Sequence, residues 1–136
     1  MTRYLVIDAD GRIERVERHS DLYVPEHPSH KGLSDRDLLN TQMAELLGNS
    51  VRFSERPLAF PEKGVTLAAG QALYANLPPK AAVSCVCVDR DDVDPQREVV
   101  GSEKFAFSAQ LAGQYDLTLT NAFPFQDQIV RIVVTV

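Results

Sequence analysis

The chain has 136 residues and a formal net charge of −5, with 44% hydrophobic and 24% charged residues. This length and composition are typical of one globular domain, or of one domain with an appended arm. A chain of this size can bury enough surface to fold without a metal or a disulfide. The acidic balance argues against a nucleic-acid-binding protein, and no apolar stretch approaches the ~20 residues that span a bilayer.

The first segment, residues 3–18, is predicted to form a β-hairpin. The runs RYLVID and RIERVER flank Asp10-Gly11, which is a strong turn signal between two apolar-containing strands. The charge at Asp8 ends the first apolar run too early for a secretory signal peptide. We therefore expect a protein that is made in a cytoplasm and binds no membrane.

Residues 19–33 contain two prolines and three histidines without periodicity and are predicted to be a loop. Residues 34–47 are predicted to form an amphipathic helix, because Ser34 is a good N-cap, Asp37 resembles a capping-box partner and Gly48 supplies a stop. Its apolar stripe would serve the core or an interface and consists of Leu38, Leu39, Met43, Leu46 and Leu47.

The composition changes after residues 51–63, a stretch with Pro57 and Pro61 that is predicted to be a linker or an extended arm. From Gly64 onward the chain consists of short β-forming runs with turn signals roughly every 8–12 residues, which is typical of a sandwich or barrel. The predicted strands are 65–69, 71–77, 81–88, 98–101, 103–109, 114–120 and 128–136.

Together these elements predict a mainly β protein in two parts. Residues 1–63 would hold the hairpin, the loop and the helix, and would act as a docking or assembly segment. Residues 64–136 would form an Ig-like antiparallel β-sandwich. "Ig-like" denotes the architecture alone, since the chain has no tryptophan and no cysteine pair at the spacing of an inter-sheet disulfide.

The two cysteines and three histidines are the first candidates for chemistry. Cys85 and Cys87 stand two apart on a strand and face the same side, which favours two buried thiols over a disulfide or a metal half-site. His19, His27 and His30 could supply imidazoles to a transition metal, but no matching cluster sets a geometry. Solvated loop histidines are the favoured interpretation.

The acidic run DRDDVD is a candidate Ca²⁺ site, because Ca²⁺ prefers oxygen ligands. The run lacks the glycine and the distal glutamate of an EF-hand loop, and aspartate favours turns on its own account. A polar loop tip is therefore the preferred interpretation, and no metal or cofactor is predicted. The four carboxylates concerned are Asp89, Asp91, Asp92 and Asp94.

No catalytic residues are predicted, because the chain contains neither a G-x-S-x-G elbow nor a phosphate-cradling loop. We therefore expect a protein that is not an enzyme. The turn that contains Phe123 and Phe125 has two interpretations. The two rings could form an exposed binding tip, or they could fold back and close the end of the sandwich.

The second half of the chain contains Leu77-Pro78 before a core strand, GQYDL at 113–117, FPF at 123–125 and a last strand that ends the chain. This pattern resembles that of small structural proteins of tailed bacteriophages. The opening YLVIDADGRIERV is similar to the hairpins with which such proteins often begin. The predicted helix is a departure from the pattern.

The resemblance implies a non-enzymatic virion component, made in the host cytoplasm and placed in the tail or at its distal end. Its partners would be other virion proteins, in a homo-oligomer or an obligate assembly that residues 1–63 hold together. Two alternatives stay open: a capsid-decoration protein, and a module that binds a carbohydrate or a host receptor through its loops.

Overall fold

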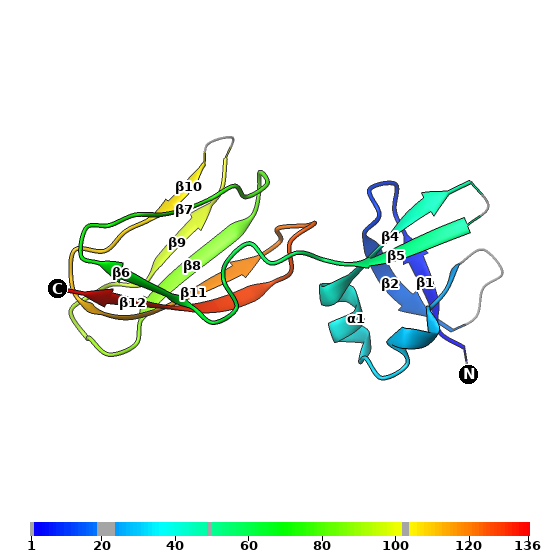
Figure 1. Cartoon of the computed structure of the whole chain (residues 1–136), viewed down its shortest axis with the longest axis horizontal. Helices are drawn as coiled ribbons and strands as arrows, with labels where there is room; N and C mark the ends of the chain where they lie inside the picture. Colours follow the sequence, from blue (N-terminus) through cyan, green and yellow to red (C-terminus); the bar gives the residue numbers. More distant parts are fainter. Residues whose placement is uncertain (1, 19–23, 49, 102–103) are drawn as a thin grey trace. The chain divides into compact units, whose positions relative to one another are not determined.

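The computed structural model describes residues 2–18, 24–48, 50–101 and 104–136 and divides the chain into two compact units, Met1–Pro57 and Leu58–Val136 (Figure 1). The fold is mainly β, as the sequence predicts. The division falls at Pro57 and not near residue 63, because Phe60 is buried in the core of the second unit. The Gln128 side chain also donates to the Phe60 carbonyl at 2.9 Å.

The first unit begins with the predicted hairpin. β1 (Tyr4–Ile7) pairs with β2 (Ile13–Glu17) on one side and with the short β3 (Val24–Pro25) on the other, both antiparallel. Asp8 organises the turn, because its Oδ1 accepts from the backbone N–H of Asp10 and of Arg12 at 2.9 Å each.

Gly11 in this turn is required by its geometry. Its φ is +89°, a left-handed conformation that favours glycine. A Cβ at this position would lie 2.5 Å from the Ala44 carbonyl oxygen, and the Ala44 N–H donates to the Gly11 carbonyl at 2.9 Å. The missing side chain therefore lets the turn pack against a later strand of the same unit.

The prediction of one helix over residues 34–47 is wrong in its second half. A 3-10 turn, η1 (Pro28–His30), precedes α1 (Asp35–Thr41), which Ser34 caps as predicted by accepting from the Asp37 N–H at 3.1 Å. The chain then continues as β4 (Gln42–Leu47), which pairs antiparallel with β5 (Ser50–Glu55). The β5 segment, which the sequence predicts to be part of a linker or an extended arm, is a strand. Its pairing overrides the weak helical preference of β4.

Arg3 holds the loop and the helix of this unit to its first strand. Its guanidinium donates to both oxygens of Glu26 at 2.8 and 2.6 Å and to Asp35 Oδ1 at 2.8 Å. It also donates to the carbonyls of Leu33 and His30 at 2.8 and 3.0 Å. The side chains of Arg3 and Glu26 are each only 12% exposed, so this ion pair lies largely out of water. Beside it is a small apolar core of Leu5, Ile13 and Leu38.

The second unit contains every strand predicted after Gly64, with small shifts in their bounds. A five-stranded sheet has the order β6-β12-β11-β8-β9, and β10 pairs with β7 in a two-stranded sheet. The strands are β6 (Val65–Ala68), β7 (Leu73–Ala75), β8 (Ala82–Cys87), β9 (Gln96–Val99), β10 (Phe105–Phe107), β11 (Gly113–Thr120) and β12 (Gln128–Thr135).

One pair of strands in this unit differs from the expected antiparallel arrangement. β6 runs parallel to β12, with Val65 opposite Ile132. The two strands are far apart in sequence and no hairpin joins them, so no tight turn imposes an antiparallel pairing. All other pairs in the described part of this unit are antiparallel.

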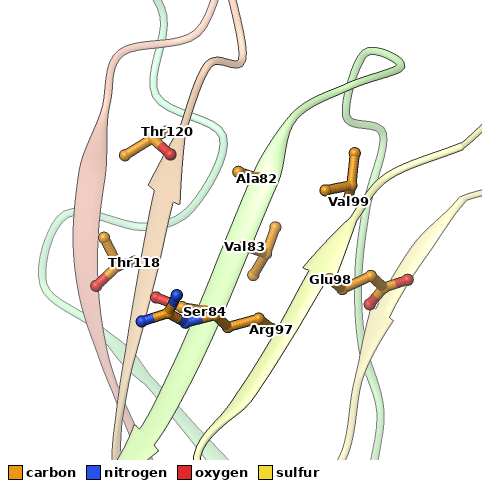
Figure 2. A pocket seen from close by; sticks show the side chains of 8 residues that line it. All are labelled: Ala82, Val83, Ser84, Arg97, Glu98, Val99, Thr118 and Thr120. Atoms are coloured by element: carbon orange, nitrogen blue, oxygen red, sulfur yellow. The ribbon is translucent and has the colours of Figure 1, made fainter.

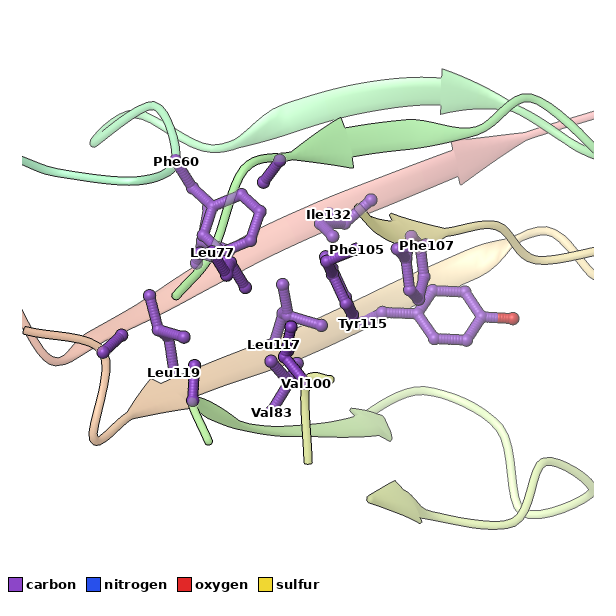
Figure 3. Close-up of a cluster of buried hydrophobic side chains, with 14 of the residues drawn as sticks. Phe60, Leu77, Val83, Val100, Phe105, Phe107, Tyr115, Leu117, Leu119 and Ile132 are labelled. Atoms are coloured by element: carbon purple, nitrogen blue, oxygen red, sulfur yellow. The ribbon is translucent and has the colours of Figure 1, made fainter. Parts of the chain in front are cut away.

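The two sheets of the second unit enclose one core (Figure 3). Alternate residues of β11 point into it, as the sequence predicts, and Leu117 and Leu119 are almost completely buried. The Phe107 ring of β10 packs edge-on against Tyr115 of β11, with centroids 5.8 Å apart. In the described part of the chain, no helix has the length and apolar character needed to cross a membrane.

Candidate functional site

The five residues of the predicted apolar stripe do not share one helix face. Leu38 lies on α1 and is fully buried in the first core, while Leu39 is only partly buried beside it. Met43, Leu46 and Leu47 belong to β4, where successive side chains alternate between faces. Leu46 and Leu47 are 57% and 45% exposed near the turn between β4 and β5. The stripe is therefore divided between a core and an exposed hairpin end.

The aromatic turn before β12 packs partly against the second core. Phe125 is half-buried there, and its N–H donates to the Ala122 carbonyl at 2.8 Å. Phe123 is also only partly exposed. For Phe125, this placement fits a residue that closes the end of the two-sheet unit better than an exposed binding tip.

Two aspartates of the acidic run, Asp89 and Asp92, bind different partners and do not share one site. Asp89 Oδ1 accepts from the Gln114 N–H at 2.9 Å, and this hydrogen bond lowers the pKa of Asp89. Asp92 forms an ion pair with Arg90 at 2.7 Å, which lowers the pKa of Asp92. Neither Asp91 nor Asp94 joins them. Across the described ranges, no group of three or more His, Cys, Asp or Glu side chains could hold a metal ion.

Two of the three histidines form an aromatic cluster with Phe53 of β5. The ring centroids of His27 and His30 lie 5.6 Å apart, and both rings contact Phe53. His30 is buried, which lowers its pKa and favours the neutral imidazole. It is therefore not the solvated loop residue that the sequence suggested. His19 lies outside the described residues.

Both cysteines are free thiols on the inner face of β8, and Cys87 is buried as the sequence predicts, while Cys85 is only partly buried. Burial raises the pKa of the Cys85 thiol to about 11, and the neighbouring Cys87 and Asp116 add to the shift. The Cys87 thiol contacts Asp89 Oδ1 at 3.4 Å. A buried thiol that resists ionisation is a packing residue and not a nucleophile.

Cys85 is expected to react slowly with iodoacetamide in the folded chain. Because its pKa is about 11, its thiolate fraction near pH 8 is roughly a hundredfold below that of an ordinary thiol, and it should rise with pH until about that value. Mass spectrometry of the Cys87→Ser variant, folded and in denaturant, measures the two rates. Equal rates in both states would contradict the raised pKa of Cys85.

The outer face of the five-stranded sheet carries a shallow groove of about 380 Å³ (Figure 2). Arg97 of β9, Ser84 of β8 and Thr118 of β11 stand in one row across three strands. The Arg97 side chain extends across β8 beside Ser84 (Figure 2). Val99, which is 70% exposed, lies at its edge. This cation with neighbouring hydroxyl groups can donate hydrogen bonds to an anionic or polar partner.

No local pattern in the sequence identifies these residues as a site. Arg97, Ser84 and Thr118 are separated in the chain, and none belongs to a recognisable motif. Only the pairing of β8 with both β9 and β11 brings them together. The outward alternation of Thr118 and Thr120 on the last-but-one strand was the one available signal.

The comparisons with known proteins identify no relative. No family model matches the chain, and neither a curated protein nor a solved structure is significantly similar to it.

Proposed function

We propose that this chain is a non-enzymatic structural protein of a tailed-bacteriophage virion, assembled through its first unit in the tail or at its distal end. The observation that carries the proposal is the end of the β4–β5 hairpin. Leu46 and Leu47 are adjacent there, and both are more than 40% exposed. Because they are consecutive residues of a strand, the two side chains make both faces of the hairpin end apolar, and exposed apolar surface marks a contact site for another protein.

The hairpin is held to the rest of the first unit near its base. A bridge between Arg12 and Met43, a hydrogen bond from Ala44 to Gly11 and the packing of Phe53 on His27 and His30 join it there. A two-stranded hairpin is only marginally stable on its own in water. A partner that covers its apolar end would therefore stabilise it as well as bind it.

The second unit supports the Ig-like part of the proposal. The Tyr115 hydroxyl donates to the Leu111 carbonyl at 2.7 Å, four residues upstream. This contact resembles the tyrosine corner of Ig-like sandwiches, in which a tyrosine hydroxyl donates to the backbone a few residues upstream. In the proposed virion protein, the first unit would bind the assembly and the second unit would be the sandwich that is displayed.

The double variant Leu46→Ser/Leu47→Ser is expected to weaken assembly. Removing two leucines from an apolar contact should raise the dissociation constant by at least roughly a hundredfold. Light scattering should then show an oligomer for the wild-type chain and a monomer for the variant. Ile129→Ser is the matched control, because Ile129 is 70% exposed but lies on the second unit.

The virion assignment is tested separately by mass spectrometry of purified phage particles from a lysate in which the chain is produced. The proposal expects the chain at a fixed copy number per particle and its loss from particles that carry the double variant. A wild-type chain that is monomeric and absent from purified particles would contradict the proposal.

A further inference from the structure

The second unit has a hollow between β9, at the edge of the five-stranded sheet, and β10 of the two-stranded sheet. A groove of about 400 Å³ runs there between β9 and β10, with Val83 and Leu117 among its lining residues. A second hollow of about 280 Å³ shares Cys85, Gln96 and Phe107 with it. The two hollows therefore form one continuous groove, which we call the β9–β10 groove.

Both walls of the β9–β10 groove are strand edges. β9 pairs with β8 and with no other strand in the described ranges, and β10 pairs only with β7. All four residues of β9 are exposed. An edge strand presents unpaired backbone N–H and C=O groups, which are a template for one more strand. The groove thus offers hydrogen-bonding walls and, below them, side chains of the core.

β9 also carries two opposite charges that form no ion pair with the described residues. Arg97 stands opposite Ser84 and lies on the outer face of the sheet. Glu98 stands opposite Val83, which points into the core, so Glu98 faces the groove. An added strand would place its own side chains directly beside these two charges, where opposite charges stabilise the pairing.

We propose that the β9–β10 groove binds an extended strand of another protein by β-augmentation. The strand carries an acidic residue opposite Arg97 and a basic residue opposite Glu98. The aliphatic stem of that basic residue would lie along the groove while its charge reaches Glu98. Its backbone would pair with β9, and its remaining inward side chains would be apolar, since they face Phe107 and Leu117.

A second copy of β9 is the less suitable occupant. Two β9 strands related by two-fold symmetry pair antiparallel, with the outer faces of their sheets on the same side. In such a pair, two registers align three residues of each strand. One register places Arg97 opposite Arg97 of the second copy, and the other places Glu98 opposite Glu98 of the second copy. Like charges directly opposite each other destabilise a strand pair. The charges of the edge therefore select a partner with a different sequence.

The test uses the full-length chain and a short capped peptide that alternates Thr and Val. The peptide carries Asp and Lys at the positions that face Arg97 and Glu98, and one inward Trp. The chain has no tryptophan, so the fluorescence of the peptide reports its own burial. We expect a blue shift on binding. Amide exchange of β9 should slow about tenfold when the peptide is at ten times its Kd, while exchange in the buried centre of β12 stays unchanged.

Two matched controls make the result specific. A peptide with proline at alternate positions lacks the required N–H donors and should not bind. Arg97→Glu should weaken binding about tenfold, and a peptide in which the Asp opposite that position is replaced by Lys should restore the lost affinity. Arg97 is exposed, so the variant is expected to fold.

Three outcomes would overturn the proposal. The first is a peptide that leaves β9 exchange unchanged, and the second is equal binding by the proline peptide. The third is β9 protection that grows with the concentration of the chain alone, which would identify a second copy as the occupant. The test does not involve Leu46 or Leu47, so its failure is distinguishable from failure of the proposed assembly through the first unit.

Discussion

Replacing Arg3 by methionine is expected to lower the free energy of unfolding of the first unit by about 3 kcal/mol. Methionine keeps much of the apolar stem but removes every donor of the guanidinium. Glu26 would then be left with a charge that is 12% exposed and has lost its ion pair. The carbonyls of Leu33 and His30 would also lose a donor. Leaving a buried charge uncompensated is among the most destabilising single changes.

The measurement is urea unfolding combined with amide exchange in each unit. Exchange in β1 and β2 should accelerate, while exchange in β11 should not. Arg131→Met is the matched control, because Arg131 pairs with Asp116 on an exposed face and its loss should change stability little. Adding Glu26→Gln to the Arg3 variant should recover part of the loss. Unchanged stability of the Arg3 variant would show that water already compensates Glu26.

Leu117→Ala is expected to destabilise the second unit by about 3–4 kcal/mol. Leu117 is 1% exposed and lies on β11, between β8 and β12 in the middle of the five-stranded sheet. Removing its isobutyl group costs the transfer free energy of that group and leaves a cavity between two sheets, which can collapse only partly. The change should also widen the floor of the β9–β10 groove.

Thermal and urea unfolding measure this loss, with Ile129→Ala as the control. Ile129 is on the neighbouring strand β12 but is 70% exposed, so its truncation should have a small effect. Amide exchange should accelerate throughout β8, β11 and β12 and stay constant in β1. A loss below about 1 kcal/mol for Leu117→Ala would mean that the two sheets close over the cavity.

Local patterns predicted most of this fold. The alternation of Tyr115, Leu117 and Leu119 identified the buried face of β11, because the period of a strand is visible within one segment. The Asp-Gly turn likewise identified the first hairpin. Non-local pairing was the main source of error in the predicted secondary structure. The residues of β4 have a helical pattern of their own, and only their pairing with β5 makes them a strand.

The candidate sites were less predictable than the strands. The exposed position of Leu46 and Leu47 depends on where α1 ends, and that end depends on the pairing with β5. The β9–β10 groove has walls from two different sheets, so no single stretch of sequence contains its signature. Arg97 and Glu98 could select a pairing strand only because β9 is an edge strand, and the sequence does not show that position.

The place of β12 in its sheet has a consequence for biosynthesis. β12 lies between β11 and β6, and it pairs Ile132 with Val65 from the start of the second unit. During translation the five-stranded sheet therefore cannot close until residues near Thr135 have left the ribosome. The first unit, whose described strands end at Glu55, can fold much earlier. Throughout this interval the nascent β8 and β11 expose their apolar faces, so the second unit is the part of the chain that a chaperone would protect.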